Sequence, residues 1–154
     1  MRGNAFTRGP KQPQIAKDTK VCILQKSDNL LYSERVVTAT AVNGLIERIT
    51  KYATKSLTEH GIKSAPGGIA GSGDATLVLE LTTIESDVTS DQNMWTGALT
   101  SKQSPKITYS LTLTSPAGAT LLNGEWTDHA EGLDNLCRKI GGKIGGRVAA
   151  FYKP

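Results

Sequence analysis

Apolar and polar residues alternate most regularly between residues 107 and 114. The apolar positions are Ile107, Tyr109, Leu111 and Leu113, and a Thr or Ser follows each of them. A period of two predicts a strand with one buried face and one polar face. A turn containing Pro116 and Gly118 separates it from a second apolar segment at 119–128, so the two strands should form an antiparallel hairpin.

Other segments also have the composition of strands. The short apolar run within 20–25 is typical of a strand covered on both faces, which would place it centrally in its sheet. Leucines recur at every second position from 77 to 81, which predicts a strand over 75–86 that ends in a polar turn at 87–93. The remaining, weaker strand candidates are 62–65 and 94–101.

Two segments repeat their apolar residues at three- and four-residue steps, as amphipathic helices do. The first should begin between Ser33 and Thr40 and end before Gly61. Its apolar positions are Val42, Leu45, Ile46, Ile49, Ala53 and Leu57. The second closes the chain, with Leu133, Leu136, Cys137, Ile140, Ile144, Val148 and Phe151. These elements predict an α+β fold in the order β-α-β-β-β-β-α, a two-layer sandwich of a mostly antiparallel sheet with two helices on one face.

The chain of 154 residues is long enough for one domain with a real core. Residues 1–19 combine basic residues with Pro and Gly, so we expect a flexible N-terminal tether, and 20–154 should form a single α+β domain. No apolar run approaches the ~20 residues that span a bilayer, and no apolar stretch of a signal peptide follows Arg2. Either the protein is cytosolic, or Met1 stands where a leader has been removed.

The net charge of +4 suits weak attraction to anionic surfaces. Four cations of the last helix form a basic stripe: Arg138, Lys139, Lys143 and Arg147. The stripe could contact lipid phosphates, other anionic groups or nucleic acid, but a solvated outer helix face is the preferred interpretation. Trp95 and Trp126 are candidate anchors for a partner or caps of the core, and both interpretations stay open.

The last helix also contains two pairs of glycines at four-residue spacing: Gly141 with Gly145, and Gly142 with Gly146. Each glycine costs roughly 1 kcal/mol of helix stability relative to alanine, so a specific role is expected. The role could be a groove that admits another chain or a lipid. Close packing against the domain's own sheet or first helix is the preferred interpretation.

Catalytic chemistry has little support in the sequence. Asp128 and His129, with Glu131 nearby, form the one cluster that combines acids with a histidine, and no nucleophile-elbow motif accompanies it. A connector between strand and helix with capping acids explains the cluster better than a hydrolase does. We therefore expect no enzymatic activity, no cofactor and no metal.

Cys22 and Cys137 are the two cysteines, and they form no metal-binding motif. Cys22 lies in the expected central strand, and Cys137 lies on the apolar face of the helix that should cover that strand. They are a candidate disulfide in an oxidising compartment. Two separate buried thiols are the alternative.

The layout resembles that of small outer-membrane lipoproteins of Gram-negative bacteria, such as the uncharacterised YajG-like group, and is similar to the lipoprotein plug of the lipopolysaccharide translocon. The segments that carry the resemblance are the strand Val21–Leu24, the helix that ends in Leu57–Ile62, the alanine-led strand Asp74–Leu81, the hairpin Tyr109–Trp126 and the terminal helix. Such lipoproteins begin at a lipidated cysteine. The resemblance therefore implies that Met1 stands in place of that cysteine and that the basic tail is a membrane tether.

The resemblance implies a non-enzymatic domain that faces the periplasm and is anchored to the outer membrane. Such a domain would assist an outer-membrane assembly by contacting an envelope protein or an anionic lipid or glycan. A small basic nucleic-acid-binding module in the cytosol is the alternative, although the basic stripe lacks aromatic residues for base stacking. A hydrolase built around His129 is the third hypothesis.

Overall fold

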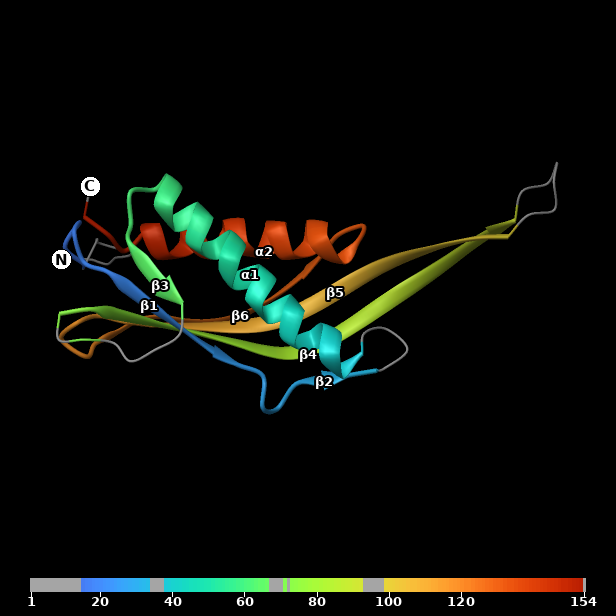
Figure 1. Cartoon of the computed structure of the whole chain (residues 1–154), viewed down its shortest axis with the longest axis horizontal. Helices are drawn as coiled ribbons and strands as arrows, with labels where there is room; N and C mark the ends of the chain where they lie inside the picture. The colour runs from blue at the N-terminus through green and yellow to red at the C-terminus, as the bar shows by residue number, and fades with distance from the viewer. Residues whose placement is uncertain (1–14, 34–37, 67–70, 72, 93–98, 154) are drawn as a thin grey trace, which may run out of the picture.

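A computed structural model describes residues 15–33, 38–66, 71, 73–92 and 99–153. In this part of the chain, two helices cover one face of an open sheet, so the predicted α+β two-layer fold is confirmed (Figure 1). The elements are β1 (Val21–Lys26), β2 (Leu31–Tyr32), α1 (Ala39–Glu59), β3 (Ser64–Pro66), β4 (Ala75–Gln92), β5 (Leu99–Thr114), β6 (Thr120–His129) and α2 (Leu133–Ala149).

The sheet is mixed, with the strand order β3-β1-β4-β5-β6. The strand β1 runs parallel to both of its neighbours, whereas β4, β5 and β6 form an antiparallel meander. The parallel pairing of β1 with β3 is possible because α1 carries the chain back along the sheet before β3 begins. The strand predicted at 20–25 is confirmed and lies inside the sheet, next to the short edge strand β3, but the helices cover only one of its faces. The strand β2 was not predicted; it has two residues and pairs with β4 beyond the end of β1.

The predicted polar turn at 87–93 is wrong, because β4 continues to Gln92 and β5 begins at Leu99. Backbone pairing extends without a break from Asp87 opposite Ser104 to Gln92 opposite Leu99. A ladder of this kind satisfies backbone groups whatever the side chains are, so a polar sequence does not exclude a strand. Trp95 lies outside the described residues.

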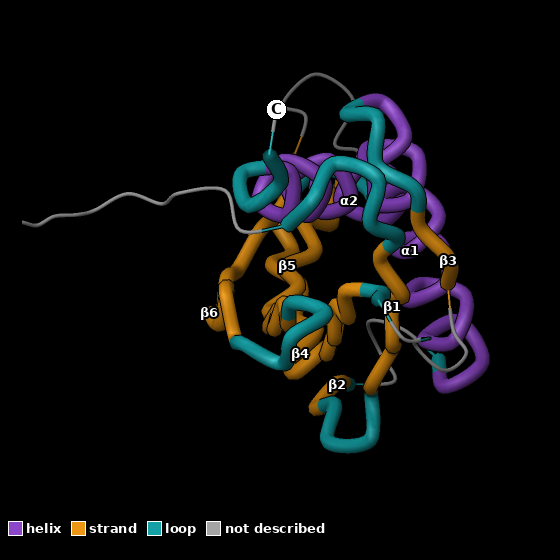
Figure 2. The backbone as a smooth tube through the Cα atoms, turned by 90° about the vertical axis from the view of Figure 1, so that its left-hand side faces the viewer, coloured by secondary structure: helices purple, strands orange, loops and turns teal. Residues whose placement is uncertain are grey.

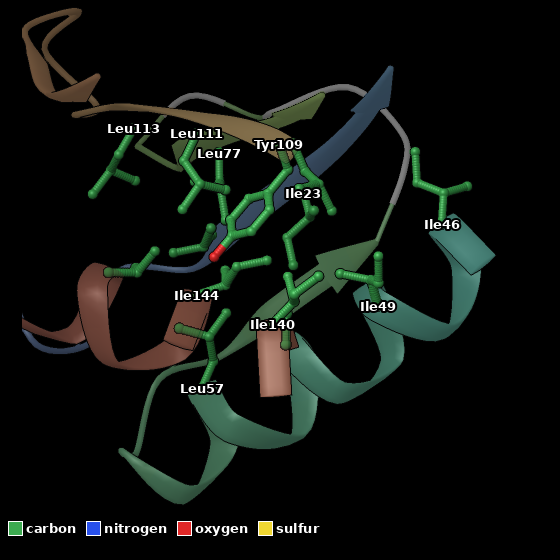
Figure 3. Close-up of a cluster of buried hydrophobic side chains, with 14 of the residues drawn as sticks. Ile23, Ile46, Ile49, Leu57, Leu77, Tyr109, Leu111, Leu113, Ile140 and Ile144 are labelled. Atoms are coloured by element: carbon green, nitrogen blue, oxygen red, sulfur yellow. The ribbon is translucent and has the colours of Figure 1, made fainter. Parts of the chain in front are cut away.

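The core lies between the sheet and the two helices. Figure 3 shows residues of β1, β4 and β5 directed towards residues of α1 and α2. Figure 2, turned by 90°, shows both helices on the same side of the strands. The alternation predicted for 107–114 is confirmed: the four apolar residues are fully buried, and Thr112 between them is half-buried.

Residues 15–19, which the sequence assigned to the tether, contact the domain. Ile15 is 1% exposed, and its backbone N–H donates to the carbonyl of Phe151 at 2.9 Å. Lys153 donates in turn to the Ile15 carbonyl at 2.9 Å, and the Tyr152 hydroxyl donates to the Thr19 carbonyl at 2.8 Å. The ordered domain therefore begins by Ile15, because a large apolar residue there completes the core beside the C-terminal end of the chain.

The disulfide considered for Cys22 and Cys137 is absent, since both thiols are buried and free. Val21 and Ile23 belong to the core under the helices, so strand alternation directs Cys22 to the opposite face. There it contacts a carboxylate oxygen of Asp74, at 3.7 Å. Cys137 is in the core, 4.0 Å from the carbonyl oxygen of Leu45. The sheet separates the two sulfur atoms, so the pairing model was wrong.

Candidate functional site: the groove between α2 and β6

A buried carboxylate connects β6 to α2. Asp128 is 5% exposed near the end of β6, and it accepts a hydrogen bond from the hydroxyl of Tyr109 at 2.7 Å. Its other oxygen forms an ion pair with Lys143 of α2. Both carboxylate oxygens therefore have donors, which is what makes a nearly buried charge tolerable.

These contacts change the acidity of both residues. Burial alone would raise the pKa of Asp128, but the hydrogen bonds from Lys143 and Tyr109 outweigh it and hold the pKa below its ordinary value of 3.8. The pKa of Tyr109 is raised, first by burial and then by its hydrogen bond to the Asp128 carboxylate. Asp128 is thus the charged partner, and Tyr109 remains a neutral donor.

Replacing Asp128 with asparagine should make the stability of the domain less dependent on pH. Because folding lowers the pKa of Asp128, its ionisation stabilises the fold fully above the ordinary value of 3.8, and this contribution is lost as the pH falls below it. Urea unfolding from pH 7 to pH 2 measures the effect. The variant should also lose roughly 1–3 kcal/mol at pH 7, since Lys143 loses its partner. Asp134→Asn, at an exposed position of α2, is the control, and an equal pH dependence in wild type and Asp128→Asn would contradict this account.

Arg147 lies on the other side of the Tyr109 hydroxyl. Its Nη1 donates to that oxygen at 2.7 Å, and its guanidinium carbon lies 4.2 Å from the centre of the Trp126 ring. The Trp126 ring in turn lies 6.1 Å from the Tyr109 ring, at an angle of 32°. A guanidinium stacked on an aromatic face and bonded at one nitrogen is held in one orientation.

A groove of about 570 Å³ opens beside this pair, and β6 and α2 form its sides. Its lining residues are Leu122, Trp126, Lys143, Gly146, Arg147, Ala150 and Phe151. A Cβ added to Gly146 would meet no atom within 4 Å, so the helix surface there is open. The groove thus has apolar walls and two cations, of which Lys143 is already paired with Asp128.

The cations of the predicted basic stripe differ in how they are engaged. Arg138 pairs with Asp134 at 3.3 Å, and Lys139 donates to the His129 carbonyl at 3.0 Å. Lys143 pairs with Asp128. Among the described residues, no ion pair includes Arg147, and its hydrogen bonding uses Nη1 alone. The structure therefore divides the stripe into three cations with local partners and one that presents free N–H donors to the groove.

The two glycine pairs of α2 differ in what surrounds them. A Cβ on Gly141 would lie 2.7 Å from the backbone nitrogen of Ala53, and one on Gly145 would lie 3.1 Å from the carbonyl carbon of Ser56. Gly141 and Gly145 therefore allow α1 and α2 to pack closely, as preferred from the sequence. Gly142 and Gly146 face open space.

The acid and histidine cluster is not arranged as predicted. Asp128 does not cap α2, whose N-cap is Gly132 without a side-chain hydrogen bond. His129 and Glu131 are exposed, whereas Asp128 is directed inward to Tyr109 and Lys143. The described His, Cys, Asp and Glu residues do not gather in groups of three that could hold a metal ion. In the same part of the chain, neither helix is both long and apolar enough to cross a bilayer.

No family model and no curated protein matches this chain. Solved structures do. PelC from Paraburkholderia phytofirmans, solved as a dodecamer, is 16% identical over 96% of both chains with a TM-score of 0.59. A hypothetical protein from Chlamydia trachomatis is 8% identical, over 87% of this chain and 97% of its own, with a TM-score of 0.54. Similarity at such low identity shows a shared fold.

Proposed function

We propose that this chain is a non-enzymatic domain of the bacterial cell envelope that binds an anionic group of an envelope partner in the α2–β6 groove. The observation that carries the proposal is Arg147, a cation fixed by Trp126 and Tyr109 with N–H donors left unused. A preorganised guanidinium loses little conformational entropy when it binds a carboxylate or phosphate. The apolar groove walls add contact area around that group.

The envelope setting is supported by the fold. The order of the elements resembles that of small outer-membrane lipoproteins, and the chain shares its fold with PelC, which was solved as a dodecamer. An accessory role in an outer-membrane assembly is consistent with both.

The cellular location is tested by fractionation. The natural gene product, tagged at its C-terminus and expressed in its own cells, should be recovered with the outer membrane and should leave it only with detergent. Recovery in the cytosolic fraction would contradict the envelope proposal and would favour the nucleic-acid-binding alternative.

Binding at the groove is tested with two anionic probes. Flotation with vesicles that contain phosphatidylglycerol reports a lipid phosphate, and affinity electrophoresis in polygalacturonate reports an acidic glycan. Arg147→Gln should weaken binding to the recognised probe roughly tenfold or more, as expected for loss of a charge-assisted contact of about 1.5–3 kcal/mol. Arg138→Gln is the matched control, because Arg138 is exposed and lies outside the groove.

Two results would contradict the groove assignment. One is equal binding by wild type and Arg147→Gln, and the other is no binding to either probe. Binding of mixed-sequence oligonucleotides that weakens steeply with salt would instead support the cytosolic alternative.

A further inference from the structure

The strands β4 and β5 continue well past the rest of the sheet. Pairing of β1 with β4 ends at Glu80, pairing of β2 ends at Ile84, and pairing of β6 with β5 begins at Lys106. Beyond these points, residues 86–92 and 99–105 pair only with each other in the strand ladders of the described chain. We call this two-stranded ribbon the arm. At about 3.3 Å per residue, it is roughly 23 Å long.

The arm projects beyond the helical layer. In Figure 1 it runs away from α1 and α2 towards the side of the molecule opposite the chain ends. An isolated two-stranded ribbon is marginally stable in water. Its two outer edges also carry backbone N–H and C=O groups that form no ladder among the described residues. Such edges are templates for pairing with another strand.

The two edges differ in charge. The β4 half of the arm contains the acidic residues Asp87 and Asp91 and no basic residue, whereas the β5 half contains Lys102 and no acidic residue. Pairing between two β4 edges would bring like charges together. Pairing of a β4 edge with a β5 edge would bring opposite charges together, which is the favourable arrangement across neighbouring strands.

Strand direction favours the same arrangement. β4 and β5 run in opposite directions along the arm. When two copies stand side by side with their arms pointing the same way, the β4 of one copy and the β5 of the next are therefore antiparallel. The new pair would continue the existing antiparallel ladder.

We propose that copies of this chain associate through their arms, the outer edge of β4 in one copy pairing with the outer edge of β5 in the next. Each copy then uses two different surfaces, so the contact is heterologous and repeats until it closes a ring or extends as a filament. This assembly does not use the α2–β6 groove, so it is tested separately from anion binding.

Ser101→Pro is designed to block the contact. The Pro105 carbonyl accepts from the Ala130 N–H at 3.4 Å, so the Pro105 carbonyl points to the outer edge of β5. Backbone groups of every second residue point to the same edge of a strand, so the Ser101 N–H also points outward. It therefore forms no hydrogen bond with β4. Removing that donor should weaken pairing with a neighbouring copy while leaving the ladder within the arm.

The measurement is the mass of the full chain by light scattering and sedimentation over a range of concentrations. Wild type should form a species of several copies, and Ser101→Pro should be a monomer with an unchanged melting temperature. A wild type that remains monomeric at every concentration would overturn the proposal. A Ser101→Pro variant with the mass of the wild type would overturn it as well.

Charge variants test which edges meet. Lys102→Glu makes both edges acidic and should give monomers. Adding Asp87→Lys and Asp91→Lys to that variant reverses both edges and should restore the wild-type mass. Lys55→Glu, the same change on the exposed face of α1, should leave assembly unaltered. Failure of the triple variant to assemble would show that complementary edges do not form the contact.

Discussion

Replacing Leu111 with alanine should lower the free energy of unfolding by about 2–5 kcal/mol, because it removes a fully buried side chain from the core face of β5. Leu111 lies opposite Leu79 in the ladder and faces the helices with it. Neighbours on a sheet cannot shift far to fill the space, so a cavity should remain. Urea unfolding at neutral pH measures the loss.

Thr112→Ala is the control for this substitution. Thr112 is the next residue on the same strand, but it belongs to the half-buried face that no helix covers. Its replacement should cost well under 1 kcal/mol, as surface substitutions usually do. Equal losses from the two variants would mean that the two faces of the sheet do not differ in packing as the structure describes.

Gly141→Ala should also be strongly destabilising, by roughly 1–3 kcal/mol, because the added methyl group has no room between the helices. Its Cβ would lie 2.7 Å from the backbone nitrogen of Ala53, and a backbone atom cannot rotate aside as a side chain does. The helices α1 and α2 would have to separate. Thermal unfolding, followed by circular dichroism, measures the result.

The neighbouring glycine supplies a control of opposite sign. A Cβ on Gly142 meets no atom within 4 Å, so Gly142→Ala gains helix propensity without a clash. It should stabilise the domain by up to about 1 kcal/mol. Destabilisation by both substitutions would indicate that glycine is needed at this point of α2 for a reason other than helix packing.

The fold could be predicted largely from the sequence because its signals are local. The alternation around Leu111 and the three- and four-residue steps of both helices identified the buried faces correctly. Amphipathic helices beside a half-apolar sheet have few ways to bury their apolar surfaces, so the two-layer arrangement followed. The β4 half of the arm was predicted as a turn because Ser, Thr and Asp are typical of turns, whereas the backbone ladder with β5 continues through it.

The site was predicted only in part because its contacts cross between elements. The hydroxyl of Tyr109 meets Asp128 across 19 positions and Arg147 across 38. Tyr109 was counted as an apolar member of an alternating strand, which concealed the role of its hydroxyl. One signal was available: a buried tyrosine needs a hydrogen-bond partner, and the second strand of the predicted hairpin ends in an acid. The basic stripe was identified, but the spacing of its residues could not show that Arg147 is the cation without a carboxylate partner among the described residues.

The β-bridge between Ile15 and Tyr152 holds the two ends of the described chain side by side. Both ends of the described chain leave the domain on the side opposite the arm (Figure 1). In a closed ring of copies joined by their arms, the Ile15 end of every copy would lie at one rim and every arm would stand at the other. Such a ring has two chemically different ends, and a tether at the N-terminus would set which end faces the membrane.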